Sequence, residues 1–186
     1  MCEPLNERLR GKYILCSCEG IAEEAIMDLL IDGGFLCFQR EDLINGECTR
    51  IRTSEHLACQ YLGTEMEREI AILRILDREK EKFVLPKVYR MRGDISVFNI
   101  VTKPEIEILH IIAEGLYADF KAQGGDIKAS AYCKQIFGHG RRRQAVKSRD
   151  FILQRYENCP ECLVDAINKY KQFAKQDEYC LADLLR

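Results

Sequence analysis

The chain lacks any long hydrophobic run. Its most apolar short stretch, residues 108–113, is far shorter than the roughly 18 to 20 residues that a helix needs to cross a bilayer. The first eight residues also lack the apolar segment of a secretory signal peptide. We therefore expect a cytoplasmic protein that does not contact a membrane, with its ten cysteines reduced.

The sequence also has little net charge. Its 28 Lys and Arg residues nearly balance 30 Asp and Glu residues, which excludes the uniformly basic surface of a histone-like protein but permits a local basic patch. It contains no Gly-x-x-x-x-Gly-Lys-Ser/Thr phosphate loop, no Gly-x-Ser-x-Gly nucleophile elbow and no His-Glu-x-x-His helix. These absences disfavour an ATPase, a serine hydrolase and a zinc protease.

Length and hydrophobic pattern predict an α/β fold with one core. A chain of 186 residues has the size of a single domain, and no repeat or low-complexity linker divides it. We expect a mostly parallel sheet flanked by helices within residues 1–124, and a basic, mainly helical segment, residues 125–186, packed on that core. Strands are predicted over residues 13–18, 35–38, 69–76, 84–89 and 95–101, and helices over residues 21–30, 54–69 and 160–186 and from residue 102 onward.

Acidic residues follow two of the predicted strands. Glu19 and Asp77 each come directly after an apolar run; Glu23 lies one helical turn beyond Glu19, and Glu79 lies two residues beyond Asp77. Because ligands of open α/β sheets bind at the carboxyl ends of the strands, these four carboxylates can converge. Such a cluster would repel itself without cations, so we expect Mg²⁺ or Mn²⁺ as the cofactor.

These residues resemble the motifs of Toprim domains, a fold shared by topoisomerases, bacterial primases, recombination mediators and overcoming-lysogenisation-defect nucleases. The resemblance rests on Glu19-Gly20 and on Asp77-Arg78-Glu79, which is similar to the family's Asp-x-Asp motif with Glu in the second acidic place. The longer Glu79 side chain would shift the ion. Residues 102–107, Thr-Lys-Pro-Glu-Ile-Glu, also resemble the proline-then-glutamate element of RloB-like Toprim proteins in phage-defence systems.

The resemblance implies a nuclease that cleaves DNA or RNA phosphodiester bonds with Mg²⁺ or Mn²⁺, in defence against phage and beside a separate ATPase subunit. The resemblance to Toprim domains covers about residues 12 to 115. Such cleavage needs a cation to offset charge on the phosphate, a positioned water and a stabilised leaving oxygen. The implied roles are metal binding or acid/base catalysis for Glu19, metal binding for Glu23, Asp77, Glu79 and Glu105, and phosphate assistance by Lys128 or, as the catalytic candidate, Lys147.

A basic segment lies within the last third of the chain. Three arginines there follow Gly138-His139-Gly140, a loop that can present backbone amides to phosphates. No recognition-helix pattern is present, so we expect contacts to phosphates rather than to bases. The predicted nucleic-acid-binding residues are Lys128, Lys134, Arg141, Arg142, Arg143, Lys147 and Arg149.

Simpler interpretations stay open for each motif. The acids can be ordinary first-turn or surface carboxylates, Glu107 among them, and the basic loop can be a solvated surface. The protein would then be a non-catalytic nucleic-acid-binding or assembly subunit.

The cysteines also have a simpler interpretation. Cys16 and Cys18 alternate on a strand and are expected to pack as small apolar groups. Cys159-Pro-Glu-Cys162 is half of a zinc knuckle, but a zinc site is unlikely because it would need two further ligands, from Cys133, His139 or Cys180.

Overall fold

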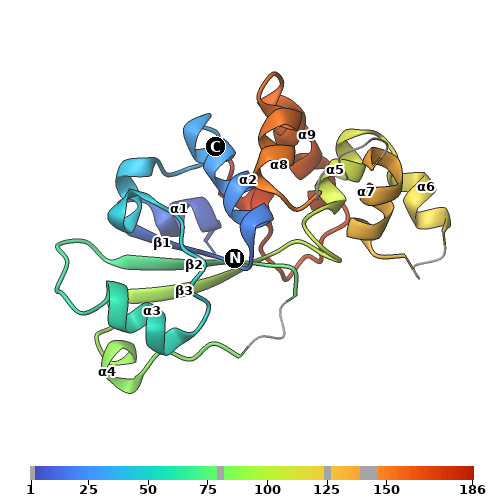
Figure 1. Cartoon of the computed structure of the whole chain (residues 1–186). Helices are drawn as coiled ribbons and strands as arrows, with labels where there is room; N and C mark the ends of the chain where they lie inside the picture. Colours follow the sequence, from blue (N-terminus) through green and yellow to red (C-terminus); the bar gives the residue numbers. More distant parts are fainter. Residues whose placement is uncertain (1–2, 79–81, 124–126, 139–145) are drawn as a thin grey trace.

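A three-stranded parallel sheet forms the centre of the molecule (Figure 1). The computed structural model describes residues 3–78, 82–123, 127–138 and 146–186. The strands β1 (Tyr13–Cys18), β2 (Ile70–Leu76) and β3 (Ile95–Val101) lie in the order β1-β2-β3, with Tyr13 opposite Ile70 and Ile70 opposite Ile95. All three strands therefore end at the same edge of the sheet. The prediction of an α/β fold with a parallel sheet is confirmed.

The central strand explains why the sheet is covered on both faces. All seven residues of β2 are buried, as expected for the middle of a parallel sheet. Leu73 packs with the cluster that includes α2 (Ile21–Asp32), while Ile72 packs with the cluster that includes α3 (Ser54–Tyr61). Figure 1 shows α2 and α3 on opposite faces of the sheet. The mostly apolar strand β2 thus lies between two hydrophobic clusters and contributes side chains to both.

The C-terminal helices pack onto the face that α2 covers. α8 (Arg149–Tyr156) contacts α2, and α9 (Pro160–Lys171) contacts α2 and α5 (Ile108–Ala113). One buried cluster contains Ile26, Ile152 and Ile167, so residues from both sides of position 125 share it. The remaining helical elements are α1 (Leu5–Leu9), α4 (Lys87–Arg90), α6 (Tyr117–Ala122), α7 (Ala129–Phe137) and the short 3-10 turns Arg40–Asp42, Ile44–Gly46 and Leu181–Leu184. No helix in the described part of the chain is both long and apolar enough to cross a bilayer.

Two predicted strands are wrong. Residues 35–38 contribute only an isolated antiparallel bridge, between Leu36 and Leu185. Residues 84–89 run instead into α4, because the carbonyl of Pro86 accepts hydrogen bonds from the Tyr89 and Arg90 amides and starts a helical turn.

Three predicted helices differ from the structure in extent. The helix predicted from residue 102 begins only at Ile108, and the one predicted over residues 54–69 ends at Tyr61. The last predicted helix ends at Lys171. Beyond it the chain returns to the sheet, where Tyr179 forms a parallel bridge with Ile100 of β3. This return is a long-range contact, which a local hydrophobic pattern does not encode.

Candidate functional site

Backbone pairing brings the two predicted strand-end acids together. Glu19 follows β1 directly, and its amide continues the ladder by donating to the Ile75 carbonyl of β2 at 3.0 Å. Its own side chain then crosses to the next strand, where Oε2 accepts the Asp77 amide at 3.0 Å. Residues 58 positions apart in sequence are thus neighbours at the carboxyl edge of the sheet.

The Asp77 side chain in turn fixes the segment that follows β3. Its Oδ1 accepts the Ile106 amide at 2.9 Å. Residues 103–107 therefore form turns over the strand ends, in place of the first turn of the predicted helix. This brings Glu105 and Glu107 to the same edge as Glu19 and Asp77.

Glu23 reaches the site from the first turn of α2. Glu23 is only 5% exposed, which is unusual for a carboxylate in the first turn of a helix. A Cβ atom at Gly20 would lie 3.1 Å from Glu23 Oε2, closer than most Cβ contacts. Glycine at position 20 thus leaves room for the Glu23 carboxylate to fold back toward the strand ends, which gives the Glu19-Gly20 pair a structural reason.

The carboxylates oppose one another electrostatically. Burial, followed by the charges of Glu23, Glu107 and Glu19, raises the pKa of Asp77 to about 7. Burial also raises the pKa of Glu23 and of Glu107 above their usual range. Together these raised pKa values indicate that the positive groups of the site do not fully neutralise its carboxylates.

Glu107 is the site residue that sequence reasoning missed. We interpreted it as a structural first-turn acid, but its side chain is fully buried, with Nζ of Lys147 3.4 Å from Oε1. Neither carboxylate oxygen accepts a hydrogen bond within the described part of the chain. The available sequence signal was weak: Glu107 lies two residues after Glu105 in the proline-then-glutamate element, and such acids are common at helix starts.

Lys147 is the cation that faces these acids. Its Nζ lies 3.6 Å from Glu105 Oε1 and 3.4 Å from Glu107 Oε1. Burial acts to lower the pKa of Lys147, but the charges of Glu107, Glu105 and Asp77 outweigh it and raise that pKa. Of the two lysines predicted to assist at a phosphate, Lys147 lies at the carboxylates, whereas Lys128 caps the start of α7.

Glu105 is held by α7 as well as by Lys147. Its Oε2 accepts the Ser130 amide at 2.9 Å. Burial acts to raise the pKa of Glu105, but the hydrogen bonds from Ser130 and the Lys147 charge outweigh it and lower that pKa. Glu105 is consequently an ionised carboxylate whose oxygens already have partners, in contrast to Glu107.

The other predicted site residues are not gathered at the carboxylates. Arg149 pairs with Asp28 of α2 at 2.7 Å, and Lys134 is exposed on α7. Glu79, Arg141, Arg142, Arg143 and His139 lie outside the described residues.

The cysteine pair of the zinc half-knuckle forms a disulfide. Cys159 and Cys162 are joined directly, so the expectation of reduced thiols is wrong for this pair. Cys133 and Cys180, the other described residues considered as zinc ligands, are free and buried in the core.

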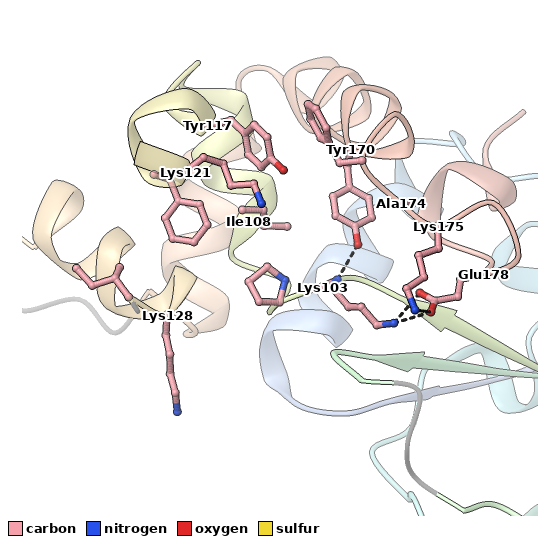
Figure 2. A pocket seen from close by; sticks show the side chains of 13 residues that line it. Lys103, Ile108, Tyr117, Lys121, Lys128, Tyr170, Ala174, Lys175 and Glu178 are labelled. Carbon is pink, nitrogen blue, oxygen red and sulfur yellow. Dashed lines mark hydrogen bonds and ion pairs between the residues drawn. The ribbon is translucent and has the colours of Figure 1, made fainter. Parts of the chain in front are cut away.

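A cavity adjoins the carboxylates through the same segment after β3. Its volume is about 430 Å³, and Lys103, Pro104 and Ile108 form part of its wall. Figure 2 shows three more lysines, Lys121, Lys128 and Lys175, around this cavity. Its remaining lining residues are Tyr117, Phe120, Ile127, Tyr170, Phe173, Ala174 and Glu178. Aromatic rings and ammonium groups thus share one opening beside the acidic site.

The donor set fits a hard divalent cation. Carboxylate oxygens are the ligands that Mg²⁺ and Mn²⁺ prefer, and in the described part of the chain the Lys147 ammonium, 3.4 Å away, is the polar partner that faces the buried Glu107 carboxylate. Within that part, the only three groups with potential ligand atoms all within 4.8 Å of one another are the thiols of Cys16, Cys18 and Cys48. No three carboxylates in the described residues come this close, so at most two of them would bind one ion directly and water would complete its coordination.

Together, the fold and the site define an α/β protein with a carboxylate cluster and a paired lysine at the carboxyl ends of parallel strands. Comparison with known proteins gives no match: no family model, no curated protein and no solved structure is significantly similar to the chain.

Proposed function

We propose that this protein is a Toprim-like nuclease that cleaves DNA or RNA phosphodiester bonds with Mg²⁺ or Mn²⁺. The observation that supports it most is the direct contact between Glu19 and Asp77 at neighbouring strand ends, in a carboxylate cluster that raises the pKa of Asp77 to about 7. An acidic group with this pKa at neutral pH is poised to exchange its proton for a cation. The phage-defence role and the ATPase partner belong to this proposal and rest on the sequence resemblance alone. The cytoplasmic location is part of the proposal too and rests on the sequence features given above.

The residues divide the chemistry of cleavage among them. Asp77 and Glu23 would hold the cation, which would supply charge neutralisation at the phosphate and a more acidic bound water, and Glu107 would add negative charge nearby. Lys147 would exchange one of its carboxylate partners for a phosphate oxygen and stabilise the charge that develops there. Glu19, which accepts the Asp77 amide and lies 3.4 Å from Arg52 Nη2, would bind the cation or act as the general acid or base, as the resemblance implies.

The Glu19→Gln variant tests catalysis directly. We expect it to lower the rate of Mn²⁺-dependent cleavage by about a hundredfold or more, in the range seen when one essential charged group is removed from an active site. Labelled single- and double-stranded DNA and RNA serve as substrates, and binding is measured in parallel by fluorescence anisotropy. Glu24→Gln is the matched control, because Glu24 lies on the same helix as Glu23 but pairs with Arg50.

Two results would contradict the nuclease proposal. One is an unchanged rate in Glu19→Gln, which would assign any cleavage to a contaminant. The other is a wild-type protein that binds these nucleic acids and cleaves none of them with Mg²⁺ or Mn²⁺. That second result favours the non-catalytic binding subunit.

We further propose that the cavity holds one nucleotide of the substrate strand. Tyr117 and Phe173 stack with ring centroids 4.2 Å apart, and Phe173 is 49% exposed, so a base could extend this stack from the exposed side of Phe173. Lys103 and Lys175 are paired with Glu178, so Lys121 and Lys128 would provide the positive charge that a phosphate chain needs.

Phe173→Ala tests this nucleotide pocket. We expect single-stranded oligonucleotide affinity to fall by about 5- to 150-fold, because stacking on one base contributes about 1 to 3 kcal/mol. Anisotropy in the Glu19→Gln background measures binding without cleavage. Met91→Ala is the control, since Met91 is another exposed hydrophobic residue, 75% exposed, and does not line the cavity. Equal affinity of Phe173→Ala and wild type would remove the pocket from the proposal.

A further inference from the structure

Three buried thiols meet beside β1, on the face of the sheet that α2 covers. Cys16 and Cys18 lie two residues apart on β1 and so point to the same face. Cys48 belongs to the segment that pairs with this strand: the Thr49 amide donates to the Cys16 carbonyl, and the Cys18 amide donates to the Thr49 carbonyl, both at 2.8 Å. Two backbone hydrogen bonds therefore set the position of Cys48 relative to the other two cysteines.

The spacing of the three sulfurs suits a metal ion. All three Sγ atoms lie within 4.8 Å of one another, and Cys16 Sγ is 4.0 Å from Cys18 Sγ. A thiolate binds zinc at about 2.3 Å, so three sulfurs around one ion of this size in a plane are separated by √3 times that distance, about 4.0 Å. The Cys16 to Cys18 distance thus matches this geometry without a change of backbone.

The environment favours a soft ion over the hard ions of the carboxylate site. Cys16 and Cys18 are fully buried and Cys48 is 7% exposed, so the ion would be shielded from bulk water. Thiolates select thiophilic d10 cations, above all Cu(I) and Zn(II).

We propose that Cys16, Cys18 and Cys48 form a binding site for one thiophilic d10 cation, Cu(I) or Zn(II). Binding is not a redox step: each coordinating thiol forms one sulfur–metal bond and releases its proton to solvent, and no group is oxidised or reduced. A three-sulfur plane suits Cu(I), whereas Zn(II) would require a fourth ligand. This site is separate from the carboxylates and does not depend on the nuclease proposal.

Anaerobic metal titration of the full-length protein tests the site. The Cys159→Ser, Cys162→Ser double variant serves as the parent protein, because it removes the other close cysteine pair. Cu(I) and Zn(II) are each titrated against a chromogenic chelator, and the ultraviolet thiolate-to-metal band reports sulfur ligation. We expect one equivalent of at least one of the two ions to bind, and Cys48→Ser in this parent to weaken that binding by at least a hundredfold.

Controls separate the site from general thiol binding. Cys133→Ser removes a buried cysteine on α7 and should bind the metal as the parent does. Circular dichroism establishes that Cys48→Ser is folded; if it is not, Cys16→Ser replaces it. Absence of stoichiometric binding of both ions, equal binding in the folded variant, or a Cys16–Cys18 disulfide in the anaerobic protein by mass spectrometry would each overturn the proposal.

Discussion

The Asp77→Asn variant is expected to unfold at a higher temperature than the wild-type protein at pH 8 in metal-free buffer. At that pH the wild-type carboxylate is ionised inside a cluster of like charges, whereas the amide is neutral and keeps an oxygen for the Ile106 amide. The pKa of about 7 corresponds, after a discount for partial solvent exposure, to a gain of about 1 to 2 kcal/mol or a few degrees in Tm. Differential scanning calorimetry measures it.

The stability advantage of Asp77→Asn over the wild type should increase with pH. A carboxyl with a raised pKa in the folded state binds its proton more tightly there than in the unfolded chain, so wild-type stability falls as pH rises from about 4 to about 7. The advantage of Asp77→Asn is therefore largest above about pH 7 and shrinks toward zero near pH 4. A constant advantage across this range, or a less stable variant at pH 8, would contradict the electrostatic description of the site.

Metal should reverse the order of the two proteins. Mn²⁺ at a hundred times its dissociation constant stabilises the protein that binds it by about 2.7 kcal/mol, so the wild-type Tm rises while that of Asp77→Asn stays nearly constant. Asp94→Asn is the matched control. Asp94 pairs with Arg92 at 2.7 Å, and this hydrogen bond lowers the pKa of Asp94. We therefore expect the same substitution there to lower the metal-free Tm slightly at pH 8.

The second large effect is expected from Lys147→Met. This change leaves Glu107 buried beside Glu105 and Asp77 without the ammonium that lies 3.4 Å from its carboxylate. Removing one partner of a buried ion pair costs about 3 to 5 kcal/mol, and because Lys147 is itself half exposed we expect about 1 to 3 kcal/mol at pH 8. Urea unfolding measures the loss, which becomes smaller as the pH is lowered, because burial raises the pKa of Glu107 and favours its neutral form.

A double variant identifies the cause of that loss. Lys147→Met combined with Glu107→Gln removes the uncompensated charge, so it should recover part of the lost stability, and the interaction term of the double-mutant cycle should be of opposite sign to the loss. Lys134→Met, an exposed lysine on α7, should change stability by less than about 0.5 kcal/mol. Additive effects of the two site substitutions would show that Lys147 stabilises the fold by some other contact.

These two predictions bear on function as well as on stability. The like-charged carboxylates repel one another in the metal-free protein, and Lys147 neutralises them only in part. The site would therefore be stabilised by an added positive charge. In the proposed function, the lysine that offsets the acids in the free protein would become available to a phosphate once a cation replaced it at the carboxylates. Stability and metal affinity of the Asp77 and Lys147 variants therefore measure the proposed site even before a substrate is known.

Local sequence patterns were sufficient for the parts of the fold that depend on local physics. The β-rich runs at residues 13–18 and 69–76 became the paired strands β1 and β2 because a buried parallel strand must be apolar on both faces. Placing Glu19 and Asp77 at strand ends followed from that, since parallel strands end at a common edge. The strand predicted over residues 84–89 was wrong because Pro86 starts a helical turn, and this effect outweighs the strand propensity of the neighbouring residues.

Only the tertiary structure decided which polar groups share one environment. Glu107 and Lys147 lie 40 positions apart, and no local pattern indicates that they meet. Their pairing depends on how the residues just before α8 and the segment after β3 pack together. The same holds for Cys48, which meets Cys16 and Cys18 through backbone bonds to β1. The sequence by itself determined the alternation of strands and helices and the acids at the strand ends. Long-range packing determined which groups are buried together, and burial sets the charge states of the carboxylate site and the spacing of the three thiols.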